Sequence, residues 1–148
     1  MITIKKSQSV DWLLPLSRTE LTRVMNAMLD AIGQAGKDVE IQLVNDATIA
    51  DLNASFLNCD GPTNILSFPA TEDGTAQHIG WLALSMDTLE RECLLYGQER
   101  VEHALRLIAH GMLHLAGYDH GEEMFALTDI AVLAGKSFLE TQEPPTIL

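Results

Sequence analysis

The sequence predicts a single α+β domain in which a small mixed sheet of about four strands is covered by about five helices. The chain has 148 residues, the usual size of one domain, so we assign residues 1–148 to a single unit. Hydrophobic residues make up 47% of the chain and aromatic residues only 5%, which indicates an aliphatic core. Short alternating segments lie among longer segments of helical spacing, so strands and helices both contribute.

The first 43 residues predict a strand, a helix and a second strand. Residues 1–6 alternate weakly, as in a short strand. Ser17 and Glu20 have the spacing of a capping box, and apolar residues then recur at helical spacing as far as Gly33. Residues 39–43 alternate apolar with polar side chains, which is typical of a strand with one buried face.

The middle of the chain predicts a helix and two further strands. Asp46 can cap a helix that runs to about Phe56, with Phe56 among the apolar residues that line it. Residues 64–68 have the pattern of a strand. Pro69 at its end favours an edge position, because proline lacks the N–H that a central strand needs. The apolar run at residues 78–84 predicts the fourth strand.

The last third of the chain predicts three helices and a short tail. The helices are expected at residues 87–97, 99–116 and 122–140, each with apolar side chains at helical spacing. The tail contains Pro144 and Pro145 and is expected to be frayed.

Three of the five histidines fall within eleven residues. His110 and His114 are four residues apart, so on a helix their imidazoles share one face. Such a pair alone is more often solvated or satisfied within the core than bound to a metal. Gly117 lets the helix end and the chain fold back, which carries His120 toward the pair. The three residues therefore predict a site for one zinc ion. Three neutral ligands leave a fourth position open for water, as in catalytic zinc sites.

The residue after the first of these histidines separates two kinds of hydrolase. The spacing H-x3-H-x2-G-x2-H is that of metzincin peptidases, in which a glutamate follows the first histidine and acts as the general base. Gly111 takes that position here. We expect the space beside the metal to be open and to lack a fixed carboxylate, which favours a phosphodiester over a peptide as substrate.

The string HGMLHLAGYDH closely resembles the signature of the bacterial YbeY family, metal-dependent endoribonucleases that act in ribosomal RNA maturation. Residues 52–53, followed by PTNILSFP at residues 62–69, resemble the other signature of that family. The resemblance covers nearly the whole chain. It implies a zinc-dependent endoribonuclease, specific for single strands, that uses a metal-activated water and acts in ribosomal RNA maturation and ribosome quality control.

The resemblance also implies a substrate cleft beside the metal, with residues 62–69 as one wall. Thr63, Asn64 and Ser67 are then candidate substrate contacts, or their polar groups satisfy the backbone at a turn and a strand end. Asp119 is expected to accept a hydrogen bond from a ligand histidine or to serve as a turn residue. The implied partners are RNA, at a local contact only, small-subunit ribosomal proteins and an assembly GTPase. Neither DNA nor a membrane is expected.

Two residues depart from the family pattern. Leu57 stands where the family usually has an arginine that is thought to contribute to catalysis or phosphate binding, and Trp81 stands where it usually has an acidic residue. Leucine cannot replace a guanidinium with five donors, so full activity requires another basic residue in that role. The candidates are Arg91, Arg100 and Arg106.

The net charge of −12, from nine basic and 21 acidic residues, excludes broad binding to a nucleic-acid backbone. Attraction for RNA must be confined to a local groove and the metal, or come from a docking partner.

Two alternative functions stay open. A metzincin-like metallopeptidase is disfavoured by Gly111, whereas a zinc-bound ribosome-assembly factor that does not cleave RNA is favoured by Leu57, Trp81 and the acidic charge.

The remaining features predict a cytoplasmic protein with two free thiols. No window has the length of a membrane span or the apolar core of a signal peptide. Cys59 and Cys93 do not form a C-x-x-C pair, and free thiols suit a reducing compartment.

The two remaining histidines are not expected to bind the metal. His103 is roughly 10 Å of helical rise from His110, too far to share its metal, so we expect a groove or core histidine. His78 is expected at the surface.

Overall fold

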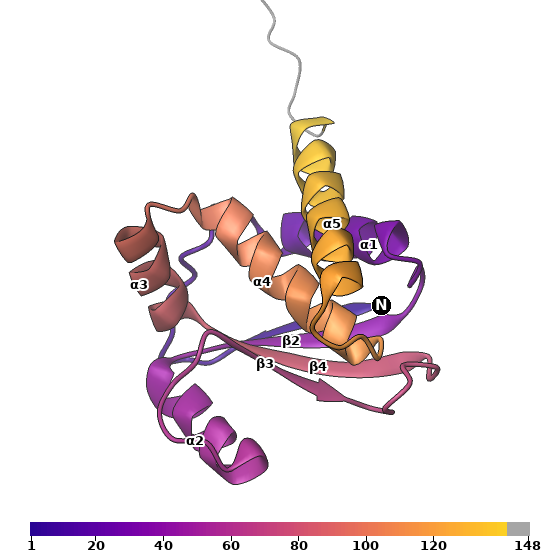
Figure 1. The fold of residues 1–148 in the computed structure, drawn as a ribbon. Helices are drawn as coiled ribbons and strands as arrows, with labels where there is room; N and C mark the ends of the chain where they lie inside the picture. Colours follow the sequence, from indigo (N-terminus) through magenta and orange to yellow (C-terminus); the bar gives the residue numbers. More distant parts are fainter. Residues whose placement is uncertain (142–148) are drawn as a thin grey trace, which may run out of the picture.

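The computed structural model describes residues 1–141 and confirms a single mixed sheet with five helices (Figure 1). The elements in chain order are β1 (Ile2–Lys6), α1 (Arg18–Ala31), β2 (Asp38–Val44), α2 (Asp46–Leu57), β3 (Ile65–Pro69), β4 (His78–Ser85), α3 (Met86–Tyr96), α4 (Arg100–Leu115) and α5 (Glu122–Thr141). No helix in this part of the chain is long and apolar enough to cross a membrane. The expected fraying of Pro144 and Pro145 concerns residues outside the described range.

The four strands lie in the order β1-β2-β4-β3. β1, β2 and β4 are parallel, and β3 runs antiparallel to β4, with Ile65 opposite Leu84 and Pro69 opposite Gly80. The crossover between β1 and β2 contains α1, and the crossover between β2 and β4 contains α2 and β3. β3 is therefore an edge strand, as Pro69 predicts, and no other strand within residues 1–141 pairs with its outer rim.

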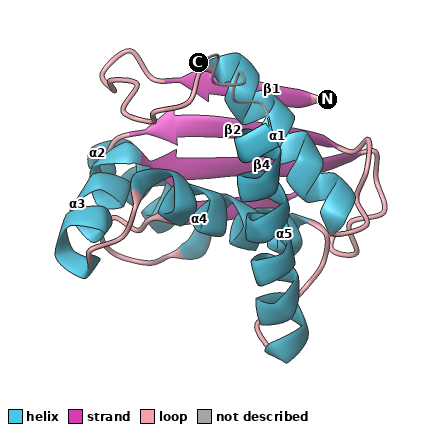
Figure 2. Ribbon diagram, turned by 90° about the horizontal axis from the view of Figure 1, so that it is seen from above, coloured by secondary structure: helices cyan, strands magenta, loops and turns pink. Residues whose placement is uncertain are grey.

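Three helices cover one face of the sheet and enclose the main core. α1, α4 and α5 lie together on this face (Figures 1 and 2), and α4 packs against both β3 and β4. Ile41, Leu82 and Leu84 point into this core and are fully buried, as are Ile108 and Met112 of α4. This packing fixes the rotation of α4 about its axis and thereby the direction in which its polar face points.

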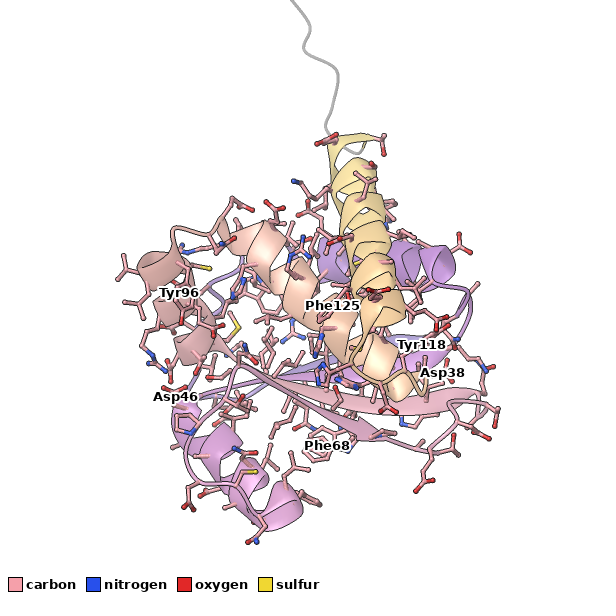
Figure 3. The ribbon with its side chains drawn as sticks, viewed as in Figure 1. Asp38, Asp46, Phe68, Tyr96, Tyr118 and Phe125 are labelled. Carbon is pink, nitrogen blue, oxygen red and sulfur yellow. The ribbon has the colours of Figure 1, made fainter. Side chains whose placement is uncertain are left out.

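A smaller helix covers part of the opposite face. α2 packs there over a second core cluster made of Val44, Ile49, Leu66 and Ala83. Phe56, which the sequence places among the apolar residues that line this helix, lies in its last turn and is 63% exposed. Its ring meets Phe68 edge-on, and Phe68 stacks on Trp81 with 4.0 Å between ring centroids. Phe68 projects on this side of the sheet (Figure 3).

The start of α2 also differs from the prediction. Asn45, and not Asp46, is the N-cap residue, because its side chain accepts a hydrogen bond from the N–H of Thr48 at 2.9 Å. Asp46 is the first helical residue, and its carboxylate instead joins α2 to the β4–α3 junction (Figure 3). It accepts hydrogen bonds from three side chains there, and we call the group the Asp46 cluster: Asp46, Ser85, Thr88 and Arg91.

Candidate metal centre

The C-terminal end of α4 and the turn after it position the three histidines. His110 and His114 lie one turn apart near the end of the helix, on the face that borders β3. Gly117 has a φ of 95°, and its N–H bonds to the carbonyl of His114 at 3.0 Å, which ends the helix. The chain then folds back and brings His120 to the pair, as the sequence predicts.

The three imidazoles converge on one point. One ring nitrogen of each lies within 4.8 Å of the others, and the Nε2 atoms of His110 and His114 are 3.2 Å apart. Two nitrogens bound to a tetrahedral zinc ion lie about 3.3 Å apart, so this separation fits a shared ion. Nδ1 of His114 donates a hydrogen bond to the carbonyl of Tyr118 at 3.0 Å, which leaves Nε2 to face the metal. The three histidines therefore form a group that can hold one metal ion.

The surroundings of two of these rings favour their neutral form. Burial, followed by the neighbouring imidazoles of His114 and His120, lowers the pKa of His110 below its ordinary value of 6.5. Burial and then His120 also lower the pKa of His114, although the Tyr118 carbonyl and Asp119 oppose this. A neutral imidazole offers the lone pair that a metal requires, so both rings are ready to bind a cation at neutral pH.

The histidines line a cleft of about 680 Å³, and the edge strand β3 forms its opposite wall. The end of α2 and the loops that follow β3 and α4 complete the rim. Glu72 and Asp119 contribute carboxylates to this lining, and within residues 1–141 no lysine or arginine does. An anionic ligand must therefore be attracted by a bound cation or by a basic group beside the cleft.

The space beside the histidines is open, as expected, but it does not come from Gly111, which is packed against the sheet. A Cβ at residue 111 would lie 2.8 Å from Cδ2 of Leu82 and 3.1 Å from Cδ1 of Ile65. The Gly111 carbonyl also accepts a hydrogen bond from the Ser67 hydroxyl at 3.2 Å. The missing side chain thus lets α4 approach β3 and β4 closely, and a glutamate at this position would displace the side chains of Leu82 and Ile65.

The three candidate substrate contacts differ in position. Asn64 and Ser67 line the cleft, whereas Thr63 is half-buried outside its lining. Asn64 also satisfies local groups, because its Oδ1 accepts from the N–H of Ile65 at 2.7 Å and its amide donates to Glu92 at 3.2 Å. Asn64 and Ser67 therefore combine a place in the cleft with the backbone-satisfying role that the sequence left open.

Asp119 is exposed at the rim of the cleft, and within residues 1–141 no hydrogen bond joins it to a histidine ring. The carbonyl of Tyr118 accepts the hydrogen bond from His114 instead. A backbone carbonyl leaves no signal in a sequence. His78 is exposed, as expected. His103, expected in a groove or in the core, is half-buried beside Glu92, with 3.0 Å between Nε2 and Oε1.

The two departures from the family pattern lie in different places. Leu57 lines the cleft and is 50% exposed, whereas Trp81 lies on the opposite face of the sheet against Phe68. The three candidate arginines each form an ion pair: Arg91 with Asp46, Arg100 with Glu90 and Arg106 with Asp129. None of the three lines the metal cleft itself.

The loop after β3 forms a wall of the cleft, and no sequence motif predicts it. Glu72 lines the cleft, and its carbonyl lies 3.1 Å from where a Cβ of Gly117 would stand. Nothing local in the sequence relates these two residues, since a tertiary contact brings the polar loop against the end of α4. A helix-ending glycine indicates a turn, but not the segment that packs on it.

The chain matches the family model described as Endoribonuclease YbeY over residues 4–129. Proteins of that name from Nitratidesulfovibrio vulgaris and Oleidesulfovibrio alaskensis are 46% and 42% identical to it; the matches cover 81% and 86% of this chain and 85% and 89% of those proteins. The solution structure of a Thermotoga maritima protein, 24% identical, shares the fold with a TM-score of 0.67 over 95% of this chain and 93% of that one. The resemblance seen in the two signatures is confirmed, and the chain belongs to the Endoribonuclease YbeY family.

Proposed function

We propose that this protein is a zinc-dependent endoribonuclease that cuts single-stranded RNA in ribosomal RNA maturation and ribosome quality control. The observation that carries the proposal is the convergence of three imidazole nitrogens within 4.8 Å of one another, on the wall of a cleft, in a chain of the YbeY family. A zinc ion bound there would supply a Lewis acid for the phosphodiester and an activated water near neutral pH.

The chain's own residues hold and orient the reacting groups. His110, His114 and His120 are the proposed ligands, and the Tyr118 carbonyl fixes the ring of His114. Asp119 acts on the site through its charge, because its carboxylate favours positive charge at His114. On the opposite wall, the Asn64 amide and the Ser67 hydroxyl are the proposed contacts to ribose or phosphate oxygens of the substrate.

A single strand of RNA suits this cleft better than a duplex. An extended strand can follow the open edge of β3, which borders the histidines. Recognition of duplex RNA by protein domains extends over about 16 base pairs and many phosphates, and a net charge of −12 opposes so wide a contact. The proposed contact with RNA is therefore local.

A zinc-bound ribosome-assembly factor that does not cleave RNA is the second candidate function. The two carboxylates that line the cleft, and the absence of a basic side chain from its lining in residues 1–141, favour this alternative. A metallopeptidase is disfavoured by the packing of Gly111.

For either RNA-related function we propose small-subunit ribosomal proteins and an assembly GTPase as partners. The free thiols of Cys59 and Cys93 suit the cytoplasm as the place of action.

Metal analysis paired with a cleavage assay tests the proposal. Purified protein is expected to hold one zinc ion per chain and to cut a single-stranded RNA while leaving a duplex of the same sequence intact. Chelation should abolish cleavage, and added zinc should restore it. An unstructured protein such as casein serves as the control substrate and should stay whole. Intact RNA beside a fully zinc-loaded protein would favour the assembly factor, and digestion of the casein would favour the peptidase.

A further inference from the structure

A second hollow of about 460 Å³ opens beside the metal cleft, between α4 and α5. Asn64, Ile65 and His110 line both hollows, so the two adjoin at these residues, and we call the pair of hollows the groove. The side of the second hollow away from β3 carries Arg106 of α4 and Phe125 of α5. Neither side chain has a role in the metal centre described above.

Arg106 is the one basic side chain of this groove. All nine lysines and arginines of the chain lie within the described residues, and among them Arg106 alone lines either hollow. It precedes His110 by four residues, so both side chains leave the same face of α4. A phosphate bound beside the metal would therefore find its nearest positive charge within the groove at this guanidinium.

The partner of Arg106 within the chain is exchangeable. Nη1 of Arg106 donates to Oδ1 of Asp129 at 2.8 Å, and the two side chains are 44% and 70% exposed. Ion pairs this open to water contribute little to stability. A phosphodiester can accept two parallel hydrogen bonds from a guanidinium, so it can displace the carboxylate of Asp129.

Phe125 adds an aromatic surface to the same hollow. It lies in the first turn of α5, where α5 packs against α4, and it is 60% exposed (Figure 3). An exposed ring beside a cation is the combination with which proteins bind single-stranded nucleic acid, because bases stack on the ring while the cation holds the backbone.

We propose that Arg106 and Phe125 form a nucleotide subsite, in which Arg106 binds a phosphate and Phe125 stacks on a base of the RNA strand that is cut at the metal. The inference rests on the proposed endoribonuclease function and deepens it by giving the strand a path. The strand follows the β3 wall, crosses His110 and enters the hollow between α4 and α5. Asp129 competes with the phosphate for Arg106.

Two pairs of matched variants test the subsite in the zinc-loaded protein. Arg106→Gln is compared with Arg100→Gln, since Arg100 is 52% exposed in a similar ion pair but does not line the groove. Phe125→Leu is compared with Tyr96→Leu, since Tyr96 is an equally exposed aromatic residue on α3 (Figure 3). The probe for binding is a fluorescent ten-nucleotide 2′-O-methyl RNA, checked for intactness by electrophoresis. Steady-state cleavage of unmodified single-stranded RNA and zinc content are measured in parallel.

Both groove variants should bind the probe more weakly at unchanged zinc content. Arg106→Gln is expected to lose about tenfold in affinity and to lower the slope of log affinity against log salt by about one. Phe125→Leu is expected to lose about fivefold without a change in that slope. In cleavage, both losses should appear mainly in KM. Arg100→Gln and Tyr96→Leu should match the native protein.

Asp129→Asn separates phosphate binding from a structural role. This variant breaks the same ion pair as Arg106→Gln, but it frees the guanidinium and is expected to tighten probe binding. Equal weakening by both variants would mean that the pair acts only in folding and would overturn the inference. Native-like affinity and salt slope in Arg106→Gln, beside normal cleavage by the native protein, would also overturn it and leave the proposed function standing. A native protein that neither binds nor cuts RNA would remove the proposed function itself.

Discussion

The Asp46 cluster and the three histidines are both groups of polar side chains, but only the first is satisfied from within the chain. Oδ1 of Asp46 accepts hydrogen bonds from Ser85 at 2.7 Å and Thr88 at 2.6 Å, and Oδ2 accepts one from Arg91 at 2.9 Å. Burial alone would raise the pKa of Asp46, but these hydrogen bonds outweigh it and hold the pKa below 3.8. The carboxylate needs nothing further.

The histidines, by contrast, direct acceptor nitrogens at one another. At most one proton can lie between the Nε2 atoms of His110 and His114, and His120 has no hydrogen-bond partner among residues 1–141. Burial and the neighbouring imidazoles lower the pKa values of His110 and His114, so protonation of these two rings is a disfavoured way to complete the cluster. The difference teaches that a satisfied polar cluster holds elements together, whereas converging lone pairs without donors mark the place where an outside cation binds.

The largest effect is expected when a histidine is removed. His114→Ala should reduce zinc occupancy by at least about an order of magnitude and abolish cleavage, because the remaining two ligands cannot hold the ion in competition with water. Zinc content after gel filtration checks this. Asp46→Ala provides the control and should retain its zinc. Full zinc retention in His114→Ala would show that the histidine cluster is not the metal site and would break the comparison.

A second large effect is expected from adding a basic side chain to the metal cleft, whose lining in residues 1–141 contains none. Leu57 lines the metal cleft but not the second hollow, so Leu57→Arg brings a guanidinium to the side away from Arg106. One electrostatic donor at a transition state is worth roughly 10²–10³ in rate, and we expect cleavage to rise toward that range at unchanged zinc content. The cleavage rates of Leu57→Arg and the native protein on single-stranded RNA test this prediction. Brisk native cleavage that Leu57→Arg leaves unchanged would mean that the native groove already supplies the donor.

A smaller effect on metal binding but a clear effect on stability is expected at the satisfied cluster. Asp46→Ala removes the acceptor of three donors and leaves the buried hydroxyl of Ser85 without an acceptor for its proton. The free energy of unfolding should fall by about 1–3 kcal/mol. Urea denaturation of the zinc-loaded protein measures it, with Asp129→Asn as the control for an exposed ion pair. Equal stability of the two variants would contradict the structural role assigned to the Asp46 cluster.

Much of the fold follows from patterns that extend along the chain. The alternation at residues 39–43 and the proline at residue 69 predicted a half-buried strand and an edge strand, and both are present. The spacing of His110, His114 and His120 predicted their convergence, because helix geometry and a glycine turn fix those distances locally.

What the sequence did not predict depends on contacts between segments far apart. Asn45 and Asp46 are adjacent and can each cap a helix; Asn45 is the cap, and the Asp46 carboxylate accepts hydrogen bonds from Ser85 and Thr88, which are distant in sequence. The tight packing of Gly111 requires β3 and β4 to be in place. Likewise, Arg106 and Phe125 come from separate helices, and no spacing in the chain indicates that they share a hollow.

The smallest expected effect is a pair of separate pH responses in the metal-free protein. The pKa values of His110 and His114 are lower in the folded chain than the 6.5 of an unfolded one, so the unfolded state takes up protons first as the pH falls. The contribution of these two histidines to the free energy of unfolding should therefore be constant above about pH 7 and decrease as the pH falls below 6.5. Asp46 acts in another window: its lowered pKa stabilises the fold above 3.8, and that contribution is lost only as the pH falls through the folded value. Urea denaturation between pH 4.5 and 8 measures the histidine contribution. The free energy of unfolding should decrease below pH 6.5 in the native protein and in Asp46→Ala, and it should decrease less in His110→Asn. A decrease of the same size in His110→Asn would assign it to other groups.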